Sequence, residues 1–141
     1  MDYFIWDKNY NTNIEKIDEQ HEILLSMMNS LHNGLKLSDT HLNKIVANVI
    51  NDLFDYISYH FKTEEDLMEK SNYPYYEEHK NEHSVFFKKM LEIQKEFSKG
   101  KLNIEKELLD FLKDWLIKHI LATDKKLGNF LLEKGNNNEN E

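Results

Sequence analysis

Apolar residues recur along this chain at intervals of three and four positions, which is the spacing of an amphipathic α-helix. Short connections separate the periodic stretches, and short connections make consecutive helices antiparallel neighbours. The chain is therefore predicted to be all-α, an up-down-up-down antiparallel four-helix bundle with an extended N-terminal arm. The four predicted helices cover about residues 18–36, 40–70, 74–98 and 103–135.

Particular residues predict where these helices begin and end. Asp18 can cap the first helix and Asn103 the fourth, because their side-chain oxygens accept hydrogen bonds from free backbone N–H groups. Pro74 fits the first turn of the third helix, where its missing N–H is harmless. Gly100 is a stop signal after the third helix, and Gly135 is expected to end the fourth.

The two ends of the chain lie outside the helical pattern. Residues 1–17 are rich in aromatic side chains and show no helical period. They are expected to form an arm whose rings, above all that of Trp6, pack on the outside of the bundle. Residues 136–141 are polar and are predicted to be a disordered tail. With no internal repeat or linker, residues 1–135 are predicted to form one domain.

Composition narrows the possible functions. The net charge of −8 argues against nucleic acid as a partner, because nucleic acid requires clustered cations. The chain has no cysteine, so a metal would have to be held by imidazole and carboxylate groups. The N-terminus lacks the pattern of a signal peptide, and no apolar run approaches the ~18 residues that indicate a membrane span. A soluble cytoplasmic protein that does not interact with membranes is the expectation.

Polar residues stand on the apolar face of every predicted helix. Residues four apart share one face of a helix, so such pairs point the same way. Antiparallel packing brings the groups of all four helices to one level, where they should face one another inside the bundle. The groups are His21 on the first helix, His60 and Glu64 on the second, His79 and His83 on the third, and His119 on the fourth.

Such a cluster needs partners if it is buried. Any one of these histidines could be an ordinary core or surface residue. Five at one level are harder to explain, because each buried polar group without a hydrogen bond costs about 1–3 kcal/mol, and a whole domain is stable by only about 5–15 kcal/mol. Metal ions would bind the free lone pairs. The number of groups exceeds the ligands of one tetrahedral ion and suits two metals bridged by carboxylates.

Asp124 is the remaining carboxylate near this level, five positions after His119. In a regular α-helix this spacing turns Asp124 about 140° away from His119 and off the inner face. A local π-helical widening, which is common at functional sites, would return Asp124 to the inner face. A widening between His119 and Asp124 is therefore our hypothesis for how this carboxylate reaches the site.

The segments around these residues form a set of motifs in a fixed order. They are Ile17-Asp-Glu-Gln-His21, His60-Phe-Lys-Thr-Glu64, Tyr73-Pro74, His79-x3-His83, and Trp115-Leu-Ile-Lys-His119 followed by Asp124. The set resembles the hemerythrin family, specifically its single-domain bacterial members, and the resemblance extends over residues 6–131. One departure is Asn13, where many relatives have glycine. Asparagine tolerates left-handed backbone better than most residues, so we interpret it as a conservative exchange at a turn.

The resemblance implies a non-haem di-iron centre that binds O₂ reversibly, with an oxo or hydroxo bridge between the two iron ions. The iron with fewer imidazoles would keep an open position for O₂. Position by position, the resemblance assigns His79, His83 and His119 to one iron, His21 and His60 to the other, and Glu64 and Asp124 as bridges between them.

Apolar residues within a turn of these positions suit a pocket for O₂. Such walls would exclude water and acids, which would otherwise hydrolyse the site or let O₂ oxidise it irreversibly. Plain core packing is the alternative explanation, and both can hold together. The residues predicted for this O₂ pocket are Leu24, Phe61, Leu116 and Ile120.

The leading function is therefore O₂ storage, delivery or buffering by a protein that is not an enzyme and is expected to be a monomer. A separate protein that receives the O₂ is a possible partner. One alternative is a module that senses O₂, NO or iron through a separate partner. Another is a di-iron oxidase or iron-storage protein, but such bundles use Glu-x-x-His pairs, which this chain lacks at the expected level.

Other polar residues near the site have a plainer interpretation. His32 is predicted to lie at the end or on the surface of the bundle. An acidic region near the cluster is interpreted as a solvated face, with an access route for iron as the alternative. Its members are Glu65, Asp66, Glu69, Glu77, Glu78 and Glu82.

Overall fold

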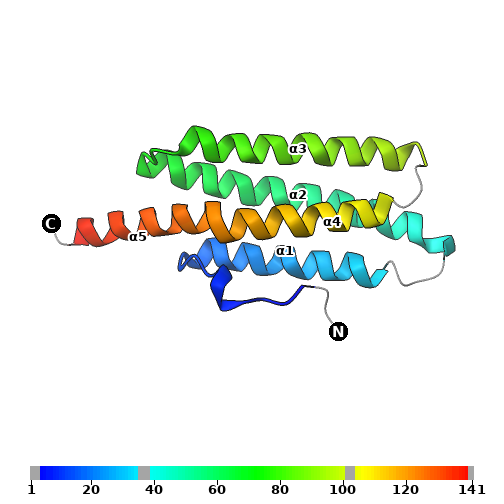
Figure 1. The fold of residues 1–141 in the computed structure, drawn as a ribbon, viewed down its shortest axis with the longest axis horizontal. Coiled ribbons are helices and arrows are strands. Elements are labelled where there is room, and N and C mark those ends of the chain that lie inside the picture. The colour runs from blue at the N-terminus through cyan, green and yellow to red at the C-terminus, as the bar shows by residue number, and fades with distance from the viewer. Residues whose placement is uncertain (1–3, 35–38, 101–103, 140–141) are drawn as a thin grey trace.

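The computed structural model describes residues 4–34, 39–100 and 104–139 of the chain. α4, the π-helical segment η2 and α5 form one continuous rod, and the chain direction reverses from each rod to the next (Figure 1). The predicted all-α four-helix bundle is confirmed, and the described residues include no strand. The helices are α1 (Glu15–Gly34), α2 (Asp39–Ser71), α3 (Tyr76–Ser98), α4 (Ile104–Lys118), η2 (His119–Asp124) and α5 (Lys125–Glu139).

The N-terminal arm lies along the outside of α1 (Figure 1), as predicted, and contains a short 3₁₀ turn, η1 (Lys8–Tyr10). The backbone N–H of Phe4 donates to Asn29 Oδ1 at 2.7 Å, and Asn29 Nδ2 donates back to the Phe4 carbonyl at 2.9 Å. Trp6 is half-buried against the core. The arm therefore covers one flank of the bundle.

The first helix begins earlier than predicted. α1 starts at Glu15, so Asp18 lies inside the helix and the prediction of Asp18 as its N-cap is wrong. The Asp18 carboxylate instead reaches back to the preceding turn, where it accepts from the backbone N–H and hydroxyl of Thr12 at 2.8 and 2.9 Å. It also accepts from the N–H of Asn13, whose φ of 66° is in the left-handed region. A carboxylate that holds this turn closed lets the helix start one turn sooner.

Two other helix ends also differ from the prediction. α3 begins at Tyr76, so Pro74 precedes the helix and is not in its first turn. α5 continues through Gly135 to Glu139, so the predicted end of the helix at Gly135 is wrong. The start of the disordered tail, predicted at residue 136, is wrong for the same reason, because residues 136–139 are helical. One glycine costs a helix only about 1 kcal/mol, which does not force it to stop. The predicted end of the first helix near Lys36 and the predicted N-cap at Asn103 lie outside the described part of the chain.

Gly100 ends the third helix as predicted. Its φ is 77°, and its backbone N–H donates to the Phe97 carbonyl at 3.0 Å. The left-handed backbone that closes a helix in this way is easiest for glycine.

Buried apolar residues form two clusters, and the polar cluster lies at their junction. The larger includes Leu24 and Phe61, and the smaller includes Ile17 and Met68. Ile17 and Leu24 are one turn before and after His21, so this histidine stands between the two clusters. Apolar layers above and below therefore keep water away from this level of the bundle. Over the residues described, no helix is long and apolar enough to cross a membrane.

Candidate metal centre

The structure brings all seven predicted ligand residues together, and each is buried. Their ligand atoms form two groups, and within each group the atoms lie within 4.8 Å of one another. Glu64 belongs to both groups and so lies between them. The first group is Glu64, His79, His83 and His119, and the second is His21, His60, Glu64 and Asp124.

Asp124 reaches the site because the fourth rod widens. Residues His119–Asp124 form the π-helical segment η2, and regular α-helix resumes at Lys125. The predicted widening is therefore confirmed. It places Asp124 Oδ1 at 2.8 Å from His119 Nε2, on the inner face of the bundle. Thr123, the residue that a regular helix would have turned inward, is half-buried instead.

The two carboxylates lie between the histidines of different helices. Asp124 Oδ2 is 2.6 Å from His21 Nε2, while its Oδ1 is 3.2 Å from His79 Nε2. Glu64 Oε1 is 2.8 Å from His60 Nε2, and its Oε2 is 3.3 Å from His79 Nε2. Each carboxylate therefore faces both groups, which is the position that a bridging ligand requires.

Polar partners hold His60 from its outer edge. His60 Nδ1 donates to Gln20 Oε1 at 2.7 Å, and Gln20 Nε2 donates to Thr63 Oγ1 at 3.2 Å. The Thr63 hydroxyl donates in turn to the Tyr59 carbonyl at 3.0 Å. A proton held on Nδ1 leaves the Nε2 lone pair free to face the carboxylates, as metal-binding histidines require.

His83 and His119 are fixed by an acid and by aromatic rings. His83 Nδ1 lies 3.2 Å from Glu65 Oε2, and its ring stacks on Phe61 with centroids 3.7 Å apart and planes inclined by 4°. The His119 ring stacks on Trp115 with centroids 4.4 Å apart. These contacts limit rotation of both rings and keep their Nε2 atoms toward Glu64.

The prediction from sequence did not identify three of these supporting residues. Gln20 and Thr63 were not singled out, and Glu65 was assigned to a solvated acidic face. A polar residue beside a candidate ligand is a weak signal on its own, because its partner is known only once the helices pack.

The four residues predicted to line the O₂ pocket are all buried in the larger apolar cluster. Each is at most 1 % exposed; they are Leu24, Phe61, Leu116 and Ile120.

Unpaired atoms at this level show that the site suits cations. His60 Nε2, His79 Nε2, Asp124 Oδ1 and both carboxylate oxygens of Glu64 are buried and make no hydrogen bond of regular geometry among the described residues. They lie within ion-pair distance of one another, so their lone pairs converge on the same small space. Metal ions would bind these lone pairs directly. A set of imidazole and carboxylate ligands without sulfur suits iron, manganese, zinc or copper.

Comparison with known proteins agrees with this geometry. The family model of the Hemerythrin HHE cation binding domain matches residues 12–131, which is most of the chain. The chain belongs to the hemerythrin family. The description of that family as cation binding matches the character of the buried site.

Similar proteins match over most of the chain. The bacteriohemerythrin of Stenotrophomonas maltophilia is 36% identical over 126 residues, covering 89% of this chain and 79% of the relative. That of Clostridium acetobutylicum is 31% identical and covers 87% of this chain and 97% of the relative. A crystal structure of wild-type hemerythrin superposes with a TM-score of 0.83 at 30% identity, covering 92% of this chain and 98% of that one.

In the metal-free hemerythrin fold, protons compete for the ligand nitrogens. Burial lowers the pKa of His60, but the carboxylates of Glu64 and Asp124 outweigh burial and raise it to about 9. The same balance raises the pKa of His79 to about 10 and that of His119 to about 9. Burial raises the pKa of Glu64, yet the neighbouring histidines hold it well below its usual value. Metal binding must therefore displace protons from the imidazoles.

We expect the metal-free chain to lose stability as the pH rises from 6.5 to about 9. His60, His79 and His119 hold protons more tightly when folded than the ordinary pKa of 6.5 allows. Their stabilisation is complete below pH 6.5 and is lost as the pH rises through about 9 to 10. In the loaded protein metal ions replace these protons. Urea unfolding of both forms at the two pH values tests this, and equal changes in the two midpoints would contradict it.

Proposed function

We propose that this chain holds two iron ions, bridged by an oxo or hydroxo group, and binds O₂ reversibly for storage, delivery or buffering. The observation that carries the proposal is the unequal division of imidazoles around two shared carboxylates. In this assignment His79, His83 and His119 hold one ion, His21 and His60 hold the other, and Glu64 and Asp124 lie between them.

The side with two imidazoles is where O₂ would bind. When bound, the iron ions would supply the electrons that O₂ takes up and returns. His21 and His60 would supply two imidazoles to their ion, one fewer than the three histidines on the other side supply, so one ligand position would stay open. His60 is held in place by Gln20, so its Nε2 stays directed inward while a ligand comes and goes. The open ligand position therefore follows from how many histidines each helix carries at this level of the bundle.

Apolar side chains would protect bound O₂ from water and protons. Leu24 lies three positions after His21 and is fully buried, and Leu116 stands in the same relation before His119. Phe61 covers the His83 ring, and Ile120 follows His119 in the same cluster. Protons that reach reduced O₂ favour its irreversible release, so excluding them supports a carrier.

The ligand types also support a carrier over an oxidase. Five of the seven clustered residues are histidines, and two carboxylates lie between the groups. Carboxylate-rich sites are the arrangement used by di-iron enzymes on bundles. Relatives named bacteriohemerythrin are consistent with a protein that is not an enzyme. The cytoplasmic location and the monomeric state stay predictions.

The purified protein is expected to contain about two iron ions per chain, because its donor set divides into two groups. After reduction without air, adding O₂ should produce a visible absorption band, and removing O₂ under argon should abolish it over repeated cycles. Metal analysis and absorption spectroscopy measure both results. A single metal per chain would contradict the two-ion centre. Oxidation in one irreversible step would contradict the carrier and favour the oxidase.

A further inference from the structure

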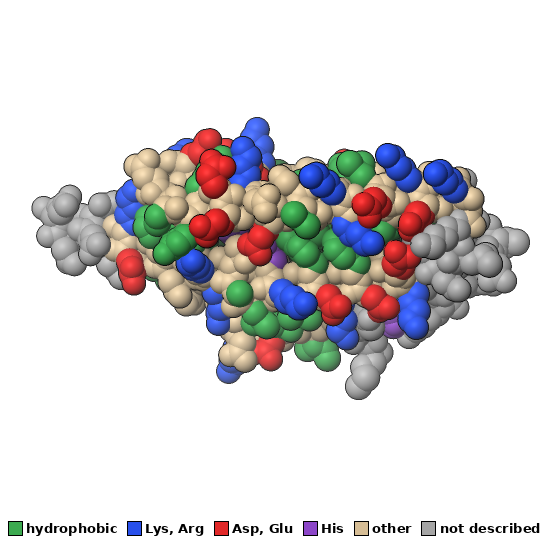
Figure 2. All heavy atoms as spheres, turned by 45° about the horizontal axis from the view of Figure 1, so that its top comes forward, with side chains coloured by type: hydrophobic (Ala, Val, Ile, Leu, Met, Phe, Trp, Pro, Cys, Tyr) green, Lys and Arg blue, Asp and Glu red, His purple; other side chains and the backbone are tan. Residues whose placement is uncertain are grey.

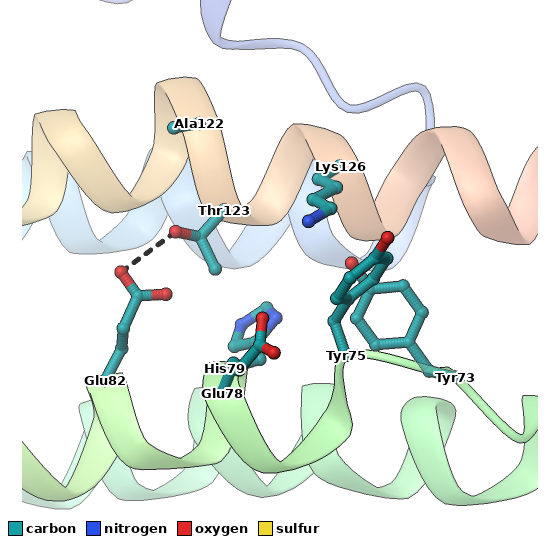
Figure 3. Close-up of a pocket in the computed structure, with 8 residues that line it drawn as sticks. All are labelled: Tyr73, Tyr75, Glu78, His79, Glu82, Ala122, Thr123 and Lys126. Carbon is teal, nitrogen blue, oxygen red and sulfur yellow. Dashed lines mark hydrogen bonds between the residues drawn. The ribbon is translucent and has the colours of Figure 1, made fainter.

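A cavity of about 310 Å³ lies between α3 and the rod formed by η2 and α5. In Figure 2 a small part of a histidine side chain is visible between the helices, with acidic side chains on one side of it. Of the seven candidate ligands, His79 lines the cavity, together with Glu78, Glu82, Thr123, Lys126 and Tyr75 (Figure 3). A volume of this size admits a cation with several of its water ligands, at ~30 Å³ per water.

His79 separates this cavity from the metal centre. Its Nε2 faces Glu64 and Asp124 at 3.3 and 3.2 Å, on the inner side. Its Nδ1, which diverges from Nε2 around the ring, has no hydrogen-bond partner among the described residues although His79 is only 2 % exposed. The corresponding nitrogen of His60 is bonded to Gln20. His79 is therefore a candidate ligand whose outer edge is not fixed by the chain.

The rim of the cavity carries acids that are linked to the centre. The Thr123 hydroxyl donates to Glu82 Oε1 at 3.0 Å, which joins α3 to η2 across the cavity (Figure 3). Glu82 Oε2 lies 4.0 Å from His119 Nδ1, while the Glu82 side chain remains 44% exposed. Glu78 projects from α3 at the same mouth (Figure 3). The Glu82 carboxylate therefore reaches from solvent to the outer edge of one ligand histidine, and Glu78 adds a second negative charge at the mouth.

Lys126 places a positive charge beside the cavity, and this charge opposes the attraction of the two acids for a cation. Its Nζ lies 3.4 Å from the centre of the Tyr75 ring, so the ammonium group rests on an aromatic face. Within the described part of the chain it forms no ion pair with Glu78 or Glu82. Lys126 therefore does not neutralise either acid, so both carboxylates can attract a cation, and the lysine partly offsets their field.

We propose that this cavity is the route by which divalent cations, ferrous ions in the cell, reach the metal centre past His79. The inference rests on the proposed function only for the existence of that centre. Anions are disfavoured by the two carboxylates, and O₂ gains nothing from a polar passage. Hard carboxylate oxygens suit a hydrated divalent cation that must exchange water for protein ligands on its way in.

The rate at which the metal-free full-length chain takes up Co²⁺ tests this proposal. The visible absorption of the bound ion measures the uptake. Circular dichroism first confirms that each variant is folded. Glu78→Gln combined with Glu82→Gln is expected to slow uptake about 3- to 10-fold, and Lys126→Gln is expected to speed it, because steering charges change association rates. Release of Co²⁺ into excess chelator should slow in the double variant too, since the same route serves both directions. The matched control is Glu92→Gln, an exposed acid of α3 outside the cavity, which should change neither rate.

The outcomes separate this inference from the proposed function. If the native chain fails to bind about two Co²⁺ ions, the two-metal centre is wrong. If it binds them but the Glu78 and Glu82 double variant loads as fast as Glu92→Gln, the cavity is not the route. A double variant that binds the same final amount of Co²⁺ more slowly, with Lys126→Gln faster than the native chain, supports the route.

Discussion

Glu64→Gln is expected to remove metal from both positions of the centre. Glu64 belongs to both groups of candidate ligands, with its oxygens 2.8 Å from His60 Nε2 and 3.3 Å from His79 Nε2. The amide keeps the shape of the side chain but has no charge, and it turns N–H donors toward lone pairs that need a cation. Losing even an outer partner of a metal ligand costs about 10–100-fold in affinity. The loss of a shared anionic ligand should therefore exceed ~100-fold at both positions.

Metal analysis after dialysis against a weak chelator measures this effect. The matched control is Glu69→Gln, five residues further along α2, where the exposed carboxylate accepts a hydrogen bond from the Tyr76 hydroxyl. An amide oxygen can accept the same bond, so the control should keep its metal. Because the fold has apolar clusters on both sides of the centre, circular dichroism should still show a helical bundle. A Glu64→Gln chain that retains one metal would show that Glu64 serves one position only.

The fold and the cluster were accessible from the sequence because both depend on helical periodicity. His60 and Glu64 are four apart on a stripe that is otherwise apolar, and so are His79 and His83. Their burial follows from that stripe, whatever the details of packing. Even the widening was accessible, because the spacing from His119 to Asp124 fits an inward carboxylate only if the helix is irregular there.

The parts that were missed depend on contacts made by side chains across the fold. Asp18 looks like an N-cap from its position, but its carboxylate reaches backward to Thr12 and lets the helix begin at Glu15. Gln20 precedes His21 in the sequence yet supports His60 on another helix. Propensity and spacing are local quantities, and neither tells which helix a side chain will meet. The supporting residues of a site are therefore harder to predict than its ligands.

The widened segment η2 has a further consequence for how this chain tolerates deletions. A π-turn holds one residue more than an α-turn, because its hydrogen bonds run from i to i+5. Removing Ala122, which is exposed, would leave Asp124 four positions after His119 and about 40° from it on a regular helix. The helices before and after this segment would keep the same sides turned toward the core, so Leu116 and Leu127 would stay buried. The extra residue is thus absorbed locally and does not set the register of α5.

We therefore expect deletion of Ala122 to preserve a cooperatively folded bundle, whereas deletion of Asp110, which is also exposed, should destroy it. In the regular helix α4, losing Asp110 turns the preceding residues by about 100°. Glu107 would then take the place of Leu108, which is fully buried, and Leu109 would turn out to solvent. Burying a charge without a partner costs several kcal/mol, a large part of a domain's stability.

Thermal unfolding followed by circular dichroism, with metal analysis of each chain, compares the two deletions. The Ala122 deletion should unfold cooperatively and bind metal more weakly than the native chain, because small displacements of His119 and Asp124 loosen ligands that the widened turn now aligns. The Asp110 deletion should show no cooperative transition. If the two deletions are equally damaging, the widening is built into the packing of the whole rod and is not a local accommodation of one residue. A deletion of Ala122 that folds cooperatively but binds metal more weakly would instead mean that the π-turn serves the alignment of Asp124, since the fold does not need it.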